Sequence, residues 1–331
     1  MYGGDVFVFR VFIKSEKLTE MYAIAIDVGS TYVRCGLINL KGEITYSFKM
    51  PSRDVLSEGE IIALINAAVR KCADVTESKI LGVGIGFPGI VEHNVILGGA
   101  DNLPGFSNVD LGALIAASTG LNVIVDNDAN MMAWGEMQFG AGRNCSDAVF
   151  LTVGTGIGGS AVINNRLYGG YRNKGMEFGH IIINFDGPPC SCGGRGCFEA
   201  YASIKALIRD YAQRTGQDIS GLNGRVITRS YLAGEAAAVE VMERHLDYMA
   251  IGITSLINIF SPQKLIIGGG VSGADGFYVQ EINRRVAERV MADAFSSSVI
   301  VPARMGNEAC LMGCASRVFS TPMLLQSNGS N

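Results

Sequence analysis

The sequence predicts an α/β protein of two domains with similar topology, each a mostly parallel sheet covered by helices. Three observations lead to this class: an internal repeat, an alternation of apolar strands with helical segments, and a composition that suits large cores. The chain has 331 residues, of which 48% are hydrophobic; this is ample for a large core, and the length suits two domains or three. Its net charge of −4 gives no electrostatic reason to expect nucleic-acid binding.

The internal repeat joins one segment in each half of the chain. Residues 23–31 read AIAIDVGST, and residues 148–156 read AVFLTVGTG. The match continues without a gap, so that GLIN at 36–39 aligns with AVIN at 161–164. Each copy is an apolar strand, a turn of Gly and Thr, a second strand and a polar hairpin turn. Such a repeat predicts two similar domains that face one another.

Strands and helices alternate after each copy of the repeat. In the first half, apolar spacing and stop signals predict strands over 80–86 and 121–125, and helices over 59–73, 111–119 and from about residue 128. The second half predicts strands over 264–270 and 298–302, and helices over 199–213, 235–259, 276–292 and 307–319. The expected division is an N-terminal extension over 1–21, a small α/β domain over 22–127 plus 305–320, and a larger α/β domain over 128–304.

The N-terminal segment is a poor signal peptide. Arg10 and Lys14 interrupt its apolar residues, and no small-residue cleavage site follows. The chain is therefore expected in the cytoplasm, where thiols stay reduced. Residues 1–20 are either a disordered or artefactual extension, with Met21 as the natural start, or an edge strand. No apolar run approaches the ~18 residues of a membrane span.

Glycine-rich turns predict contacts with phosphate. DVGST at 27–31 and GTGIGG at 154–159 place backbone N–H groups in concave arrays that suit phosphate oxygens, and Asp27 suits Mg²⁺. Taken singly, each turn is more often a structural hairpin. GTGIGG also matches a dinucleotide fingerprint, but a strand follows it instead of a helix, which disfavours that interpretation. LIIGGGV at 265–271 predicts either a flat-ligand contact, such as adenine, or a simple strand-to-helix turn.

Three polar residues, Asp126, Asn127 and Asp128, end an apolar strand, and Asp128 opens the next helix. N-capping is one explanation of such residues. The other is a general base at the carboxyl edge of a sheet, where ligands of α/β proteins bind. A base beside a sugar hydroxyl would take its proton during phosphoryl transfer. The residues alone leave both explanations open.

One histidine and three cysteines form the pattern H-x₉-C-x-C-x₄-C, made of His180, Cys190, Cys192 and Cys197. Four nitrogen and sulfur ligands suit tetrahedral Zn²⁺, and filling all four positions predicts a structural site in a loop over 180–197. A disulfide conflicts with a reduced compartment and pairs poorly across C-x-C. Free loop cysteines are the remaining alternative. The other five cysteines are interpreted as core residues.

Taken together, these motifs resemble the ROK family of repressors, open reading frames and sugar kinases, within the actin-like hexokinase superfamily. Coverage runs from about residue 22 to 319. The motifs that carry the resemblance are DVGST, GFPG (86–89), NLPGF (102–106), DNDAN (126–130), GTGIGG, EFGH (177–180), CSCGGRGCFEAYAS (190–203) and IIGGGV. The resemblance implies two ribonuclease-H-like (actin-like ATPase) domains with a central cleft.

The resemblance also implies an activity: ATP- and Mg²⁺-dependent phosphorylation of a hexose, most often at the 6-hydroxyl. Glucose is the default acceptor, while N-acetylglucosamine, N-acetylmannosamine, mannose and allose stay open. A homodimer is expected from the family only, and neither a membrane nor a nucleic acid is expected as a partner.

The matched motifs assign expected roles to individual residues. Asp128 is the expected catalytic base. The residues expected to hydrogen-bond the sugar are Asn102, Asn127, Asp128, Glu177, His180 and Glu199. Those expected at phosphate and Mg²⁺ are Asp27, Gly29, Thr31, Gly154, Thr155 and Gly156, and those expected near adenosine are Gly269 and Gly270. His180 would use one ring nitrogen for zinc and the other for a sugar hydroxyl.

A sugar-sensing regulator of the ROK family without catalysis is the alternative function, and the presence of Asp128 argues against it. Members of the repressor branch carry an N-terminal helix-turn-helix, whereas residues 1–20 alternate as a strand would, which disfavours a DNA-binding role. A nicotinamide oxidoreductase conflicts with the missing helix after GTGIGG.

Overall fold

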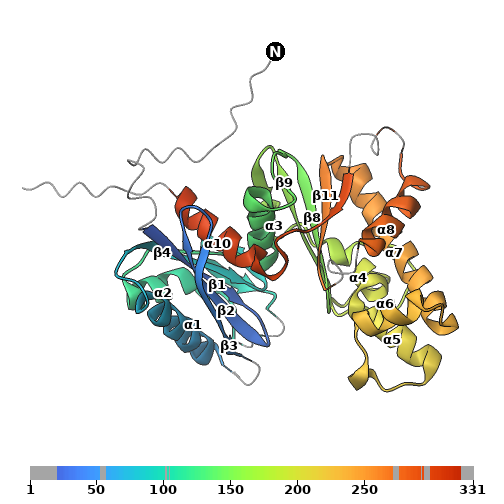
Figure 1. Cartoon of the computed structure of the whole chain (residues 1–331), viewed down its shortest axis with the longest axis horizontal. Coiled ribbons are helices and arrows are strands. Elements are labelled where there is room, and N and C mark those ends of the chain that lie inside the picture. The colour runs from blue at the N-terminus through green and yellow to red at the C-terminus, as the bar shows by residue number, and fades with distance from the viewer. Residues whose placement is uncertain are drawn as a thin grey trace, which may run out of the picture. The chain divides into compact units, whose positions relative to one another are not determined.

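The computed structural model describes residues 21–52, 57–100, 103, 105–270, 276–291, 293 and 299–321. The expectations for residues 1–20 and for Asn102 lie outside these ranges. The chain divides into two compact units, drawn from blue to red along the sequence in Figure 1. Unit 1 comprises the residues up to Gln138 and those from Ala309 on, and unit 2 comprises Phe139–Glu308.

Unit 1 is built on a five-stranded sheet of order β3-β2-β1-β4-β7. Its strands are β1 (Met21–Val28), β2 (Tyr32–Asn39), β3 (Ile44–Pro51), β4 (Lys79–Phe87) and β7 (Val123–Asn127). The first three strands are antiparallel, whereas β4 is parallel to both β1 and β7. A small hairpin of β5 (Ile90–Glu92) and β6 (Val95–Gly98) follows β4.

Helices cover both faces of the unit 1 sheet. They are α1 (Glu58–Ala73), α2 (Leu111–Thr119), α3 (Asp128–Phe139) and α10 (Ala309–Ser320). α1 and α2 pack together on one face, and α10 lies on the other against β1 and β4 (Figure 1). The apolar faces of α1 and α2 form one core with the buried side chains of β1 and β4. The predicted helices over 59–73 and 111–119 are confirmed.

Helices α3 and α10 cross at two glycines, Gly135 and Gly313. A Cβ on Gly313 would overlap the carbonyl oxygen of Met131, and one on Gly135 would overlap that of Ala309. The two backbones therefore touch, and this contact explains why the compact units group α3 with α10. The division expected from sequence instead began the second domain at Asp128, and those boundaries stay a prediction.

Unit 2 repeats the sheet of unit 1. Its order is β10-β9-β8-β11-β12, and the strand directions correspond pair by pair to those of unit 1. The strands are β8 (Ala148–Val153), β9 (Ile157–Ile163), β10 (Arg166–Tyr168), β11 (Lys264–Gly269) and β12 (Val299–Pro302). The internal repeat is thereby confirmed. Because GTGIGG runs into a strand, β9, and not into a helix, the rejection of the dinucleotide fingerprint is also confirmed.

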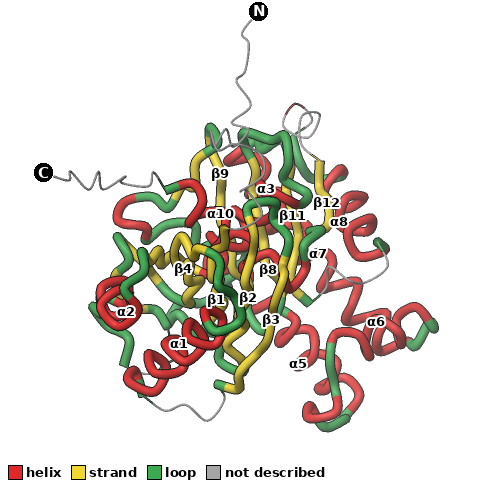
Figure 2. The backbone as a smooth tube through the Cα atoms, turned by 60° about the vertical axis from the view of Figure 1, so that its left-hand side comes forward, coloured by secondary structure: helices red, strands yellow, loops and turns green. Residues whose placement is uncertain are grey.

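The helices of unit 2 are α4 (Phe198–Ala202), α5 (Ile204–Thr215), α6 (Gly224–Leu232), α7 (Ala236–Phe260) and α8 (Phe277–Ala287). Short 3₁₀ turns lie at η2 (Tyr171–Asn173), η3 (Phe178–His180), η4 (Ile219–Gly221) and η5 (Gly306–Glu308). The long α7 contacts α4, α5, α6 and α8, and Figure 2 shows α5, α6 and α7 lying together. Within the described ranges, every helix is too short or too polar to cross a lipid bilayer.

The helix predicted over 199–213 is two helices in the structure. Ser203 breaks it, because its extended backbone ends α4 and its hydroxyl accepts the Ala206 N–H at 3.1 Å to cap α5. The apolar spacing continues through the break, so periodicity alone could not reveal it.

The close α3–α10 crossing predicts that a side chain at Gly313 lowers stability. Gly313→Ala is expected to lower the free energy of unfolding by about 1–3 kcal/mol, because the added methyl group forces two backbones apart. Gly59→Ala is the matched control, since a Cβ there meets nothing within 4 Å and a helix favours Ala. Thermal unfolding of both variants checks this. An unchanged midpoint for Gly313→Ala would show that the crossing has room to spare.

Candidate functional site

The carboxyl ends of β1, β4 and β7 bring Asp27, Gly86 and Asp126 side by side in unit 1. The strand register pairs Asp27 with Gly86, and Gly86 with Asp126. Asp128 follows as the first residue of α3. A Cβ on Gly86 would overlap the Cys310 sulfur and lie 3.5 Å from the Asp128 Cα. The missing side chain therefore leaves room for the Cys310 sulfur of α10, while the contact with Asp128 would be an ordinary one.

Asp27 is buried and forms an ion pair with Arg34. Arg34 Nη1 donates a hydrogen bond of 2.8 Å to Asp27 Oδ2 from the neighbouring strand β2. The guanidinium side chain stays 45% exposed, so its other donors reach solvent. Sequence reasoning missed Arg34, although positions 27 and 34 are equidistant from the turn and therefore pair across the hairpin. The expected phosphate residues Gly29 and Thr31 lie in that turn.

Asp128 has the properties of a general base. Burial, and to a lesser extent the negative charge of Asp27, raise the pKa of its carboxyl group to about 6. The Ala129 N–H donates to Asp128 Oδ1 at 2.9 Å, which holds the carboxylate at the start of α3. An acid of this pKa is mostly ionised at neutral pH and still accepts a proton readily.

Asn127 is the N-cap of α3, and its amide group is largely occupied. Its Oδ1 accepts the N–H groups of Ala129 at 2.9 Å and Asn130 at 3.2 Å, and its Nδ2 donates to the Gly89 carbonyl at 2.8 Å. One N–H of the amide is then left for a ligand. Capping therefore applies to Asn127, whereas a general base at Asp128 stays a prediction.

The equivalent edge of unit 2 carries glycines. The register of β8 and β11 pairs Val153 with Gly269, and the turn 154–156 follows Val153 directly. Gly269 has a φ of 90°, and a Cβ there would overlap the Val153 backbone. Gly270 N–H donates to the Val153 carbonyl at 3.0 Å. The expected phosphate turn and the expected adenosine contact are therefore neighbours.

Around the start of β9 lie the expected sugar residues of unit 2. Glu177 is exposed and precedes η3, where its carbonyl accepts the His180 N–H at 2.9 Å. Gly179 packs so closely that a Cβ would overlap the Ile157 carbonyl oxygen. From α4, Glu199 Oε2 accepts the Ile157 N–H at 2.8 Å.

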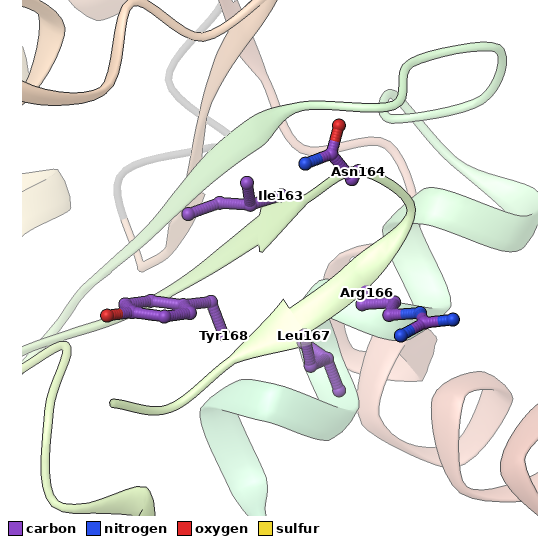
Figure 3. Close-up of a pocket in the computed structure, with 5 residues that line it drawn as sticks. All are labelled: Ile163, Asn164, Arg166, Leu167 and Tyr168. Atoms are coloured by element: carbon purple, nitrogen blue, oxygen red, sulfur yellow. The ribbon is translucent and has the colours of Figure 1, made fainter. Parts of the chain in front are cut away.

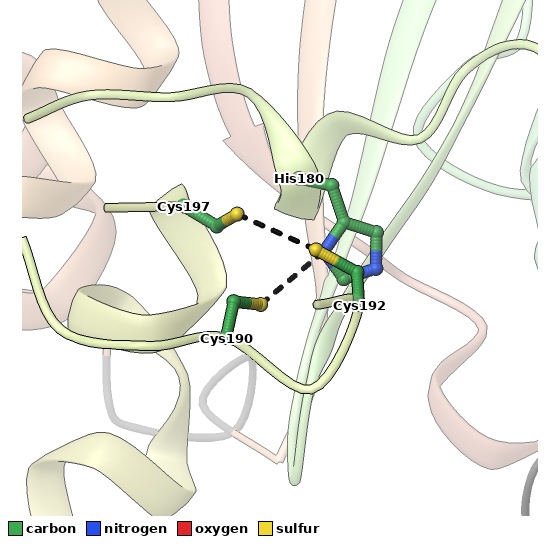
Figure 4. A group of neighbouring side chains, drawn as sticks. All are labelled: His180, Cys190, Cys192 and Cys197. Atoms are coloured by element: carbon green, nitrogen blue, oxygen red, sulfur yellow. Dashed lines mark hydrogen bonds between the residues drawn. The ribbon is translucent and has the colours of Figure 1, made fainter. Parts of the chain in front are cut away.

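His180, Cys190, Cys192 and Cys197 form one cluster, in which the donor atoms all lie within 4.8 Å of one another (Figure 4). His180 Nδ1 is 3.6 Å from Cys190 Sγ, and the sulfurs of Cys192 and Cys197 are 3.7 Å apart. Tetrahedral zinc with ordinary bond lengths separates such ligands by about 3.6 Å for N and S and about 3.8 Å for two S atoms. The donor set therefore fits Zn²⁺ in both type and spacing, and Nε2 of His180 stays available.

Tight turns build the segment that holds the three cysteines. Cys190 N–H donates to the Gly194 carbonyl at 2.8 Å, and Gly193 N–H donates to the Cys190 carbonyl at 3.1 Å. Gly196 has a φ of 70°, and a Cβ there would overlap the carbonyl of Asn184. A hydrogen bond from the Gly194 backbone lowers the pKa of the exposed Cys192 thiol, which favours the thiolate.

A separate surface pocket lies at the β9–β10 hairpin (Figure 3). The turn uses two asparagines with φ of 51° and 61°, which allow a tight hairpin. Its lining residues are Ile163, Asn164, Arg166, Leu167 and Tyr168. None of them is among the residues expected from sequence at the site.

Comparisons with known proteins agree with these features. The model of the ROK family matches residues 23–320. A glucokinase of Thermotoga maritima is 32% identical, over 90% of this chain and 98% of its own length. A putative xylose repressor of Caldicellulosiruptor is also 32% identical, over 90% of this chain and 78% of its own length.

Solved structures extend the comparison to the fold. A ROK family glucokinase from Streptomyces griseus, in complex with glucose and AMPPNP, has a TM-score of 0.78 and 30% identity, over 89% of this chain and 98% of its own. A ROK hexokinase from Thermus thermophilus has a TM-score of 0.77 and 28% identity, over 89% of this chain and 97% of its own. The fold is the actin-like, two-domain α/β fold of these kinases, and the chain belongs to the ROK family.

Proposed function

We propose that the chain transfers the γ-phosphoryl group of ATP to a hexose, at the 6-hydroxyl, with glucose as the default acceptor. The observation that carries this proposal is Asp128, a carboxylate with a raised pKa at the carboxyl edge of a parallel sheet. The glucokinases among the relatives support it. N-acetylglucosamine, N-acetylmannosamine, mannose and allose stay open as acceptors.

In this proposal, Asp128 orients the acceptor hydroxyl and takes its proton as the oxygen attacks phosphorus. Little covalent chemistry is then left for the protein, which acts by positioning the reactants and by stabilising charge. Asn127, Glu177, His180 and Glu199 would hydrogen-bond the other sugar hydroxyls, together with Asn102. The engaged amide of Asn127 limits it to one such bond.

Nucleotide contacts are proposed for each unit by itself. Asp27, Gly29 and Thr31 would meet phosphate and Mg²⁺, and the turn 154–156 would present further N–H groups. Gly269 and Gly270, beside that turn, would lie against adenosine. Mg²⁺ would supply positive charge at the phosphates. Arg34, which donates to Asp27 Oδ2, would hold the Asp27 side chain in place.

The cluster of His180 and three cysteines would hold a structural Zn²⁺. The measured separations of its donor atoms support this assignment. A metal there would cross-link the loop 180–197 and leave His180 Nε2 free for a sugar hydroxyl. A homodimer and a cytoplasmic location, both expected from sequence, stay predictions.

A regulator that binds sugar without catalysis is the second candidate, because xylose repressors reach the same identity as the glucokinases. A coupled assay of ADP release over a panel of hexoses separates the two functions. A kinase gives sugar-dependent turnover with at least one hexose. Sugar binding without any turnover would instead favour the regulator.

Replacing the base tests the central assignment. Asp128→Asn is expected to lower kcat by roughly 10²–10⁴-fold, because the amide cannot take the hydroxyl proton. Steady-state kinetics with the preferred hexose measures this. Asp110→Asn is the matched control, since Asp110 also begins a helix in unit 1 and Asn caps equally well. A kcat that barely falls in Asp128→Asn would remove Asp128 from the mechanism.

The raised pKa of Asp128 predicts a pH dependence. Only the ionised base is active, so kcat/KM is expected to rise about tenfold per pH unit below about pH 6 and to level off above it. A rate that is flat from about pH 5 to 7 would contradict the assignment.

The same pKa also affects stability. Because the folded pKa lies above the ordinary value of 3.8, this group stabilises the fold fully below about pH 4, and the contribution is lost as pH rises through about 6. Between about pH 4 and 6, the midpoint of thermal unfolding should therefore fall less in Asp128→Asn than in the wild type.

The cluster of His180 and three cysteines gives a further prediction, for zinc content and sugar binding. Cys192→Ser is expected to reduce bound zinc, and to weaken sugar binding because His180 loses its anchor. Elemental analysis and sugar titration measure the two effects. Cys145→Ser is the control, since this buried cysteine lies outside the cluster. Complete loss of zinc with unchanged sugar affinity would separate the loop from the sugar.

A further inference from the structure

Glu199 connects the metal loop to the expected phosphate turn. Its Oε2 accepts the backbone N–H of Ile157 at 2.8 Å, at the end of the turn 154–156. Its Oε1 accepts the hydroxyl of Ser191 at 3.3 Å. Ser191 lies between two metal-cluster residues, Cys190 and Cys192. One carboxylate therefore bridges two segments that are far apart in sequence.

The contact between Glu199 and the turn is close. A Cβ on Gly156 would overlap Glu199 Oε2, so only glycine leaves room for the carboxylate at this position. The same segment holds the turn by a second bond, from the Ile204 N–H to the Gly154 carbonyl at 2.8 Å. The turn is thus fixed at both of its ends by residues that follow the loop 180–197.

The start of α4, which carries Glu199, is firmly packed. Its neighbour Phe198 is fully buried, and its ring fills the place of a side chain at Gly252 on α7. The Phe198 N–H donates to the Ile181 carbonyl at 2.8 Å. Cys197, a member of the metal cluster, is the N-cap residue of α4. A displacement of Cys197 would therefore move Glu199 with it.

We propose that Glu199 and Ser191 are positioning residues through which the metal loop sets the shape of the phosphate turn. This inference rests on the proposed kinase function and extends the role of Glu199 beyond the sugar. A carboxylate that accepts the Ile157 N–H turns this donor away from the ligand and fixes the peptide planes before it. Loss of zinc then weakens nucleotide binding as well as sugar binding.

Nucleotide binding without sugar tests this directly, because a lost sugar contact has no effect on it. Glu199→Ala is expected to weaken binding of a non-hydrolysable ATP analogue, with Mg²⁺, by about tenfold, since a charge-assisted hydrogen bond is lost. Glu199→Gln should restore most of this affinity, because its amide oxygen still accepts the Ile157 N–H. Titration calorimetry on the full chain measures each affinity.

Ser191 supplies a milder and better matched pair of variants. Ser191→Ala removes the hydroxyl and is expected to weaken nucleotide binding roughly two- to threefold with zinc content unchanged. Ser191→Thr keeps the hydroxyl and should bind as the wild type does. Ser191 is exposed, so neither substitution is expected to affect folding.

Amide hydrogen exchange tests the hydrogen bond between Ile157 and Glu199 without any ligand. The Ile157 amide should exchange faster in Glu199→Ala, and faster in the wild type once a chelator has removed zinc. Exchange in the buried strand β11 serves as the reference for intact folding.

The outcomes separate the two proposals. If the wild type phosphorylates a hexose but neither nucleotide affinity nor Ile157 exchange responds to these changes, Glu199 serves the sugar alone and the inference fails. If the wild type binds nucleotide and sugar without turnover, the proposed kinase function fails. A faster Ile157 exchange on zinc removal would then still support the connection.

Discussion

The crowding of negative charge at one sheet edge of unit 1 is the constraint on which the candidate site depends. Parallel register places the ends of β1 and β7 on either side of the end of β4, so Asp27, Asp126 and Asp128 share this edge. Each charge meets a different environment. Arg34 pairs with Asp27 and Asn130 donates to Asp126, whereas burial raises the pKa of both Asp126 and Asp128. Asp128 differs from the other two in being the first residue of a helix, and it is the proton acceptor that we propose.

The two units use one sheet topology for different chemistry. At the same edge where unit 1 gathers acids, unit 2 gathers glycines, and its backbone N–H groups provide the polar character. Glycine at 156 and 269 allows other groups to approach the chain closely, whereas Gly86 leaves room for the Cys310 side chain of α10. Function therefore follows from what each copy of the repeat carries at its edge and not from the shared scaffold.

Much of the fold, and the meeting of His180 with its three cysteines, could be predicted because their signals are local. Apolar periodicity marks strands and helices, and the spacing of His180 and its three cysteines allows few other interpretations. Other features depend on contacts between distant segments. That Gly89 occupies the amide of Asn127, or that Glu199 reaches Ile157, follows only from the folded chain. Neither contact leaves a pattern in the residues around it.

The return of the chain to unit 1 affects the order in which the protein can fold during synthesis. Helix α10 packs on β1 and β4, and the backbone of Cys314 lies where a side chain on Gly84 would be. The first half of the chain therefore leaves the ribosome with this face of its sheet uncovered. Unit 2 is continuous from Phe139 to Glu308 and is complete before α10 emerges. The unit that comes first in sequence is thus the last to close, and its early strands need protection from aggregation meanwhile.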